Sequence, residues 1–223
     1  MRSTPTDVRG VQRPGADGRK GGPSRGDVRY DKILEVAEAL LAEKPLRTIT
    51  IEDVANRAGI TRPTFYFYFD SKYALLAALL ERIVAVEVDG TDRWWRARPD
   101  GVTPRQACER VHHDVLALWR RHAPVVREAT EAMSLDPQLH AVYTQIVDRF
   151  VAGASTHIVR EREHGSAPPG ADPTTLAATL VWMAERNLYA AVADLVPRVS
   201  DEQRVAAITD TWVRAIYGTS DPR

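Results

Sequence analysis

Five side chains between residues 62 and 72 carry groups that suit contacts with a nucleic acid. Arg62 supplies a guanidinium. Thr64, Tyr66 and Tyr68 supply hydroxyls, and on a helix all four side chains are expected to project outward. Such groups hydrogen-bond to phosphate oxygens and to the edges of bases. Lys72 follows in the first turn of the next expected helix, where a cation is slightly unfavourable, so a phosphate ligand would give its placement a use.

The residues just before this set predict a helix, a tight turn and a second helix. Thr50 and Asp53 have the spacing of a capping box, so the first helix should begin directly after Thr50. Gly59 should end it, because a residue without a Cβ atom readily enters the left-handed conformation that closes a helix. Thr61 can then cap the second helix, with Pro63 in its first turn.

The aromatic run at residues 65–69 allows two interpretations. By propensity alone, five consecutive aromatic residues favour a strand. The run starts inside a capped segment and stops at Asp70-Ser71, a new cap, and this context favours a helix. On a helix Phe65 and Phe69 share one face and can be buried. The alternative, three short helices with surface aromatic residues and no further role, stays open.

Four segments resemble a known family. Residues 49–72, ITIEDVANRAGITRPTFYFYFDSK, resemble the DNA-binding domain of the TetR family of bacterial repressors, and RPTFYFYF followed by SK is similar to its ethionamide-regulator (EthR) branch. Residues 161–165 (EREHG), 183–190 (MAERNLYA) and 212–218 (WVRAIYG) also resemble that branch. The resemblance covers roughly residues 28–218.

The resemblance implies an all-α fold, with an N-terminal three-helix helix-turn-helix domain and a C-terminal helical bundle for ligand binding and dimerisation. It implies a homodimer that binds palindromic operator DNA in the bacterial cytoplasm, at the nucleoid, and that a small apolar effector releases. Neither an enzyme activity nor a cofactor is expected. The DNA-binding residues would be Thr50, Thr61, Arg62, Pro63, Thr64, Tyr66, Tyr68 and Lys72.

Breaks at proline and glycine divide the chain. We expect a disordered basic arm at 1–27, the helix-turn-helix domain at 28–72, the ligand-binding and dimerisation domain at 73–218, and a tail at 219–223. Apolar spacing predicts helices over residues 28–43, 72–97, 103–121, 124–133, 136–164, 173–193 and 201–217.

Charge is distributed unevenly along a chain whose formal net charge is zero. Residues 1–29 contain seven Lys and Arg against three acidic residues, and their many Gly and Pro residues cannot form a core. Arg19, Lys20 and Arg25 are expected to contact phosphates or the minor groove. An ordinary solubilising tail is the alternative. The single Cys108 suits a reducing cytoplasm, and no apolar stretch is long enough for a membrane span.

The ligand-binding residues are those that the resemblance places in an apolar cavity of the second domain. The EthR branch has two asparagines where this chain has Val181 and Ala184, and a tyrosine where it has Gly153. Any ligand should therefore be more apolar, or be held by other groups such as Tyr143 or Cys108. The full set is Val115, Trp119, Val147, Phe150, Gly153, Val181, Ala184 and Trp212.

A dimer is expected because one short helix buries too little surface to find a genomic site alone. The last two helices carry more apolar residues than one core face requires. Their candidate interface residues are Leu188, Tyr189, Val192, Val205, Ile208 and Ile216.

Two alternatives to a ligand-responsive regulator stay open. Glu109 and His112, and again Glu161 and His164, have the Glu-x-x-His spacing that di-iron bundles place in their cores. The second pair lies at a charged helix end, and two further core carboxylates are missing at matching positions, which disfavours such an enzyme. If the apolar cavity is only core, the protein is instead a constitutive DNA-binding protein.

Overall fold

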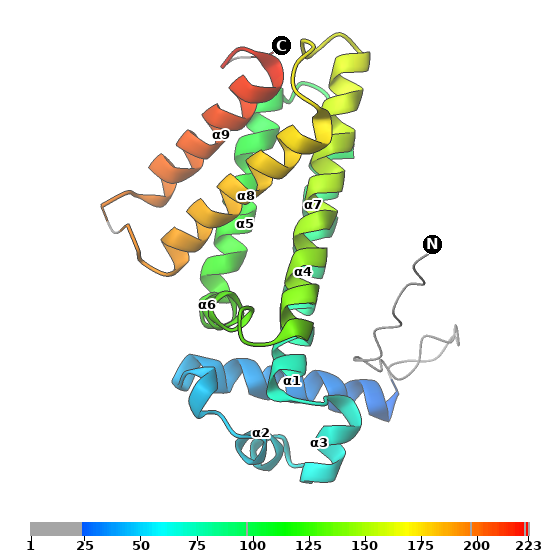
Figure 1. Ribbon diagram of the computed structural model, residues 1–223, viewed down its shortest axis with the longest axis vertical. Coiled ribbons are helices and arrows are strands. Elements are labelled where there is room, and N and C mark those ends of the chain that lie inside the picture. The colour runs from blue at the N-terminus through cyan, green and yellow to red at the C-terminus, as the bar shows by residue number, and fades with distance from the viewer. Residues whose placement is uncertain (1–23, 97, 197, 221, 223) are drawn as a thin grey trace, which may run out of the picture. The chain divides into compact units, whose positions relative to one another are not determined.

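The computed structural model describes residues 24–96, 98–196, 198–220 and 222, and of residues 86–96 it describes only the helical backbone. Over these residues the fold is all α, as the sequence predicts (Figure 1). The helices are α1 (Arg25–Glu43), the 3-10 helix η1 (Leu46–Thr48), α2 (Ile51–Ala58), α3 (Arg62–Tyr68), α4 (Lys72–Arg96), α5 (Pro104–Arg121), α6 (Ala123–Ala132), α7 (Pro137–Glu163), α8 (Pro173–Val192) and α9 (Asp201–Tyr217).

The chain forms two compact units. The first consists of the described residues up to Leu80 together with Glu128–Ala141, and the second of Glu81–Arg127 together with the residues from Val142 onward. Three helices, α4, α6 and α7, therefore contribute residues to both units.

In the first unit, α1 begins three residues earlier than expected. Ser24 caps it through a capping box with Asp27, so residues 25–27 belong to the helix and not to the arm. The helix buries one stripe, with Ile33 and Leu34 almost fully inaccessible to solvent. Near its first turn the ring of Tyr30 stacks on Phe69, with 5.2 Å between the ring centroids.

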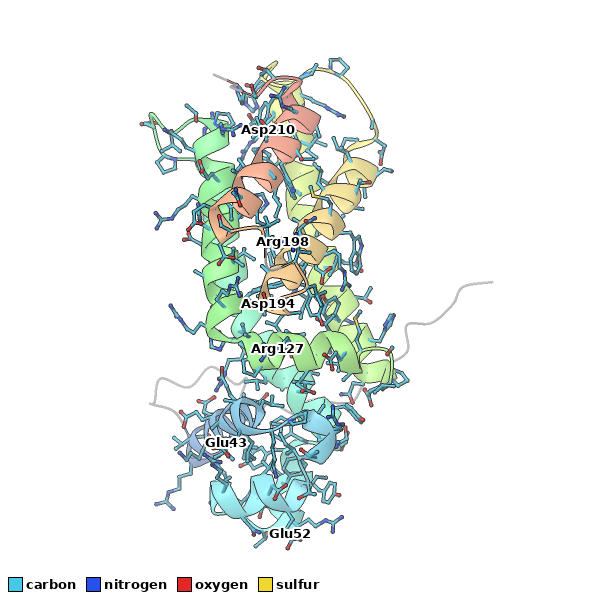
Figure 2. The ribbon with its side chains drawn as sticks, turned by 90° about the vertical axis from the view of Figure 1, so that its left-hand side faces the viewer. Glu43, Glu52, Arg127, Asp194, Arg198 and Asp210 are labelled. Atoms are coloured by element: carbon cyan, nitrogen blue, oxygen red, sulfur yellow. The ribbon has the colours of Figure 1, made fainter. Side chains whose placement is uncertain are left out.

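In the second unit, α5 packs mainly against α9, and α8 packs against both (Figure 1). Capping boxes begin α5 at Thr103 and α9 at Ser200, and Gly218 ends α9 with φ of 72°. Asp210 on α9 accepts hydrogen bonds from two arginines, Arg105 of α5 at 3.2 Å and Arg214 at 2.7 Å; Figure 2 labels this carboxylate.

The residues expected at a dimer interface are placed differently from the prediction. Each of the six is at most 8% exposed in this single chain, because the apolar stripes of α8 and α9 face the core of their own unit. A surface for another copy must therefore use other residues. The six are Leu188, Tyr189, Val192, Val205, Ile208 and Ile216.

A buried polar cluster joins α7 to the end of α9. The Tyr217 hydroxyl lies 3.0 Å from Nε2 of His157 and donates to Oε2 of Glu161 at 3.2 Å. Arg160 lies 3.5 Å from the Glu161 carboxylate. Burial, reinforced by the neighbouring carboxylate, raises the pKa of Tyr217 well above its ordinary value, so the phenol stays a donor at neutral pH.

Among the described residues, no helix combines the length and the apolar character that crossing a membrane requires.

Removing the Tyr217 hydroxyl should destabilise the fold. We expect Tyr217→Phe to lower the free energy of unfolding by about 1–3 kcal/mol, because Glu161 and His157 stay buried and lose a hydrogen-bond partner. Urea titration followed by circular dichroism measures this. Tyr66→Phe is the matched control, since Tyr66 is 42% exposed and its loss should change the unfolding free energy little. Equal effects of the two changes would show that the cluster contributes nothing.

Candidate nucleic-acid interface

The cap that begins α2 has the geometry predicted from the sequence. The Thr50 hydroxyl accepts from the Asp53 amide at 3.1 Å, and the Asp53 carboxylate accepts from the Thr50 amide at 2.9 Å. The same carboxylate accepts from Nζ of Lys44 at 2.8 Å. The bond from Lys44, followed by the interactions with the Thr50 backbone and side chain, lowers the pKa of Asp53 to about 2, so the carboxylate stays charged and the cap stays intact at neutral pH.

The turn between α2 and α3 depends on Gly59. Its φ is 67°, in the left-handed region, and its amide donates to the carbonyl of Asn56. Ile60 donates to the carbonyl of Ala55 at 2.9 Å, which completes the helix end. Thr61 then caps α3 by accepting from the Thr64 amide at 3.3 Å, and Pro63 lies in the first turn. Both helices begin as predicted and α2 ends as predicted, whereas α3 ends at Tyr68, so Phe69 follows the helix.

The buried face of α3 fixes its outer face. Phe65 is fully buried and Phe69, the residue after the helix, is 1% exposed. Arg62 and Pro63, in the first turn of α3, are exposed, and Tyr66 is 42% exposed. The Arg62 guanidinium lies over the Tyr66 ring, 5.7 Å from its centroid. A cation and an aromatic edge are thus held together on one accessible surface.

The expected outward placement of Tyr68 is wrong, and an exposed residue was missed. Tyr68 is 5% exposed and packs near Tyr30, whereas Phe67 is 63% exposed. Tyr68 is buried because it lies three residues after the buried Phe65 and therefore on the same face of the helix. A count of helical positions would have found Phe67, which is an apolar surface suited to a thymine methyl group.

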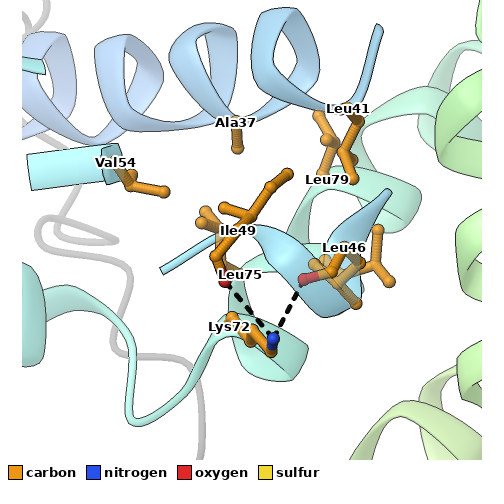
Figure 3. Close-up of a pocket in the computed structure, with 9 residues that line it drawn as sticks. Ala37, Leu41, Leu46, Ile49, Val54, Lys72, Leu75 and Leu79 are labelled. Carbon is orange, nitrogen blue, oxygen red and sulfur yellow. Dashed lines mark hydrogen bonds between the residues drawn. The ribbon is translucent and has the colours of Figure 1, made fainter. Parts of the chain in front are cut away.

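Lys72 contacts the protein main chain. Its ammonium donates to the carbonyls of Leu46 at 2.9 Å, Ile49 at 3.3 Å and Arg47 at 3.4 Å. Figure 3 shows the first two of these bonds at the edge of a small apolar pocket that α1, α2 and α4 share with the segment between α1 and α2. The start of α4 is thereby tied to the segment that precedes α2. The ammonium has three hydrogens, so a phosphate would have to share or replace one of these carbonyls.

The remaining DNA-binding candidates lie at helix starts or outside the described residues. Thr50 and Thr61 are exposed caps, and Thr64 is partly exposed with its hydroxyl 2.8 Å from that of Thr61. Arg25 is exposed in the first turn of α1. Arg19 and Lys20 lie outside the described residues.

The candidate ligand residues come from four helices of the second unit. Val115 and Trp119 lie on α5, Val147, Phe150 and Gly153 on α7, Val181 and Ala184 on α8, and Trp212 on α9. Five of them are buried, whereas Trp119, Phe150 and Gly153 are partly exposed. Of the two polar groups expected to compensate for the missing amides, Cys108 is buried beside His112, and Tyr143 donates a hydrogen bond to Glu185.

His112 is a buried neutral histidine in this unit. Its ring packs edge-on against Trp212, with 5.4 Å between ring centroids, and its Nδ1 lies 3.4 Å from the Thr209 hydroxyl. Burial lowers the pKa of His112 to about 4 and raises the pKa of Cys108 to about 12. Neither group carries a charge at neutral pH.

The two Glu-x-x-His pairs do not meet. Glu161 belongs to the cluster with Tyr217, and His164 is exposed with its ring bonded to the carbonyl of Arg160. In the part of the chain that the structure describes, no group of three His, Cys, Asp or Glu side chains could hold a metal ion.

The two halves of the chain match two family descriptions. Residues 33–79 match bacterial regulatory proteins of the tetR family, and residues 109–218 match the C-terminal domain of the transcriptional regulator EthR. The HTH-type transcriptional regulator EthR of Mycolicibacterium smegmatis is 35% identical over 202 residues, which cover 91% of this chain and 92% of that protein.

Solved structures agree on the fold. A putative TetR-family transcriptional regulator from Syntrophomonas wolfei has a TM-score of 0.69 at 17% identity, covering 85% of this chain and 95% of its own. The transcriptional regulator FadR from Bacillus subtilis, in complex with stearoyl-CoA, has a TM-score of 0.69 at 14% identity, covering 84% of this chain and 100% of its own.

A helix-turn-helix in one unit and a helical bundle in the other define a DNA-binding transcriptional regulator. With the matches above, the chain belongs to the TetR family of bacterial transcriptional regulators, and its second half matches the EthR branch, as the sequence predicted.

Replacing Lys72 tests its contacts with the main chain. We expect Lys72→Met to lower the free energy of unfolding by about 1–3 kcal/mol, because partly buried carbonyls lose a charged donor. Thermal unfolding measures this, with Lys32→Met as the control, since Lys32 forms a surface ion pair with Glu35 and such pairs contribute little to stability. If both variants unfold alike, and Lys72→Met lowers the salt slope of DNA binding by about one, Lys72 acts chiefly on a phosphate.

Acid should destabilise the second unit through His112. Its pKa is about 4 in the folded chain against an ordinary 6.5, so the unfolded chain binds the proton more readily. Stability should therefore fall as the pH drops from about 6.5 to about 4, by about 3 kcal/mol for this group. Urea titrations across this range should show that His112→Leu removes much of the slope. His113, the next residue, is exposed, so His113→Gln is the control. If His113→Gln reduces the slope as much as His112→Leu, the slope does not come from His112.

Proposed function

We propose that this chain is a ligand-responsive repressor that binds two-fold symmetric operator DNA at the bacterial nucleoid as a homodimer. Residues 28–72 would form the DNA-binding domain and residues 73–218 the ligand-binding and dimerisation domain. The observation that carries the proposal is α3, whose buried aromatic face leaves Arg62, Tyr66 and Phe67 exposed.

The chemistry of that exposed face fits the major groove. A guanidinium donates hydrogen bonds to guanine or to a phosphate, and a phenol hydroxyl can hydrogen-bond to a base edge or to a phosphate. An apolar ring suits contact with a thymine methyl group. Because α3 has only seven residues, about two helical turns, these side chains lie close together along it. Thr50 and Thr61 at the exposed helix starts would contact the phosphates that flank the groove.

A dimer would use the outward faces of α8 and α9. Trp182 is 43% exposed, and an accessible large aromatic side chain is a typical anchor of an interface. An isologous pairing would place each α8 and α9 against the same helices of a second copy. The exposed residues on these faces are Thr175, Thr179, Trp182 and Arg186 on α8, and Ala206, Ala207, Thr211 and Ala215 on α9.

Release by an effector is supported by the second unit and by a related fold. Val115, Val147 and Val181, from three different helices, are buried there, and FadR, which shares the fold, is described in complex with stearoyl-CoA. The continuous helix α4 runs from the first unit into the second and would carry the signal. The coupling should be about 1–3 kcal/mol and reciprocal between ligand and DNA.

DNA binding is tested by removing the exposed ring of Tyr66. On a duplex site selected from random DNA, Tyr66→Ala should weaken binding by about 1–3 kcal/mol, the usual cost of losing a groove contact. A gel-shift titration measures the affinity. Leu135→Ala is the control, because Leu135 is 71% exposed and lies outside α2 and α3. Unchanged affinity for Tyr66→Ala, with Leu135→Ala also unchanged, would contradict the proposed use of α3.

The dimer is tested by placing a charge on its proposed surface. Sedimentation at micromolar concentration should give about twice the chain mass of 24.8 kDa. Trp182→Glu should shift this to the chain mass, because losing a central aromatic anchor costs about 2 kcal/mol or more of association. Leu135→Glu changes an apolar residue elsewhere that is even more exposed, at 71%, and should leave the dimer intact. A wild-type monomer would refute the proposed dimer.

A further inference from the structure

One carboxylate in the second unit is buried without full hydrogen bonding. Glu185 on α8 is 7% exposed. Its Oε1 accepts a hydrogen bond from the Tyr143 hydroxyl of α7, whereas its Oε2, within the described part of the chain, is buried and has no hydrogen-bond partner. A buried carboxylate oxygen without a donor is unfavourable, and native proteins contain few of them.

The neighbouring arginine does not satisfy this oxygen. Nε of Arg186 lies 3.6 Å from Oε2, beyond normal hydrogen-bond distance. Its side chain is 52% exposed, and its guanidinium lies over the Tyr189 ring, 5.1 Å from the ring centroid. Solvent therefore screens its charge, and the carboxylate keeps the capacity to accept from a donor on the buried side.

The carboxylate lies among apolar residues of its own helix. Val181, Ala184 and Leu188, at positions four and one before Glu185 and three after it, are all buried. A partner for this position must therefore bring a hydrogen-bond donor, best a cationic one, together with hydrocarbon that the apolar surroundings accept.

We propose that Glu185 is the polar anchor of the effector site and that the effector is an apolar organic cation, such as an amine with a hydrocarbon chain. The Tyr143 hydroxyl positions the carboxylate by holding Oε1, and Oε2 accepts from the ammonium of the ligand. This assignment rests on the proposed function and names the chemical class of its effector.

Three probes of equal length test the proposal on the intact wild-type protein. Calorimetry is run with n-octylamine, n-octanol and octanoate, which carry a cationic, a neutral and an anionic head. We expect octylamine to bind about tenfold more tightly than octanol or better, because a charge-assisted bond replaces a neutral one, and octanoate to bind least. Equal affinity of amine and alcohol, or no saturable binding of the amine, overturns the proposal.

Variants identify the anchor. Glu185→Gln keeps the shape of the side chain and removes the carboxylate, so octylamine should no longer bind more tightly than octanol. Glu185→Asp keeps a carboxylate and should retain part of the preference for octylamine. Glu163→Gln removes an exposed carboxylate from the same unit and should change nothing. An amine preference that survives in Glu185→Gln overturns the assignment. If that variant fails to fold, the wild-type probes and Glu185→Asp still decide.

The outcome is separable from that of the proposed function. DNA binding is measured without any probe present. If the protein binds two-fold symmetric operator DNA but does not prefer octylamine over octanol, only the proposed effector class is refuted. A chain that prefers the amine but binds no DNA refutes the regulator and leaves Glu185 as a cation site.

Discussion

The DNA-binding surface depends on holding two helices that are too short to be stable alone. Helices of eight and seven residues, α2 and α3, fall well below the length at which isolated helices persist in water. Their stability must come from capped ends and from burial. Thr50, Gly59 and Thr61 satisfy the backbone at their ends, and Phe65 and Phe69 bury the inner side of α3 and the residue that follows it.

The same constraint explains Lys72. The ammonium donates to three carbonyls of the segment between α1 and α2, those of Leu46, Arg47 and Ile49, and Figure 3 shows two of these bonds. A cation in the first turn of α4 is unfavourable towards the helix dipole, and these carbonyls compensate. In the first unit the charge of Lys72 thus holds the backbone between α1 and α2, whereas Arg62, Tyr66 and Phe67 of α3 remain exposed.

The sequence predicted the elements whose rules are local. Capping pairs, the left-handed glycine and the prolines lie within a few residues of the helix ends that they control, so both ends of α2 and the start of α3 followed from them. Tyr68 carries a polar hydroxyl, but its position three residues after Phe65 places its ring on the buried face of α3. Leu188 and Val205, which were expected at a dimer interface, are buried within their own unit, because apolar spacing does not reveal which neighbour a helix packs against.

Non-local polar contacts could not be predicted from the sequence at all. Tyr217 and Glu161 are far apart along the chain, as are Tyr143 and Glu185, yet each pair is hydrogen-bonded within the second unit. The two clusters differ in one respect. The Tyr217 hydroxyl satisfies both of its neighbours, which suits a structural role, whereas the Glu185 carboxylate retains an oxygen without a donor among the described residues.

The central claim is that two copies of α3 contact two related sequences in one DNA duplex. Selection of bound duplexes from a random pool by the purified protein, followed by sequencing, tests it most directly. The account predicts enrichment of an inverted repeat whose half-site centres are separated by about one helical turn or a multiple of it. Enrichment of a single unrepeated sequence, or no enrichment, would contradict it.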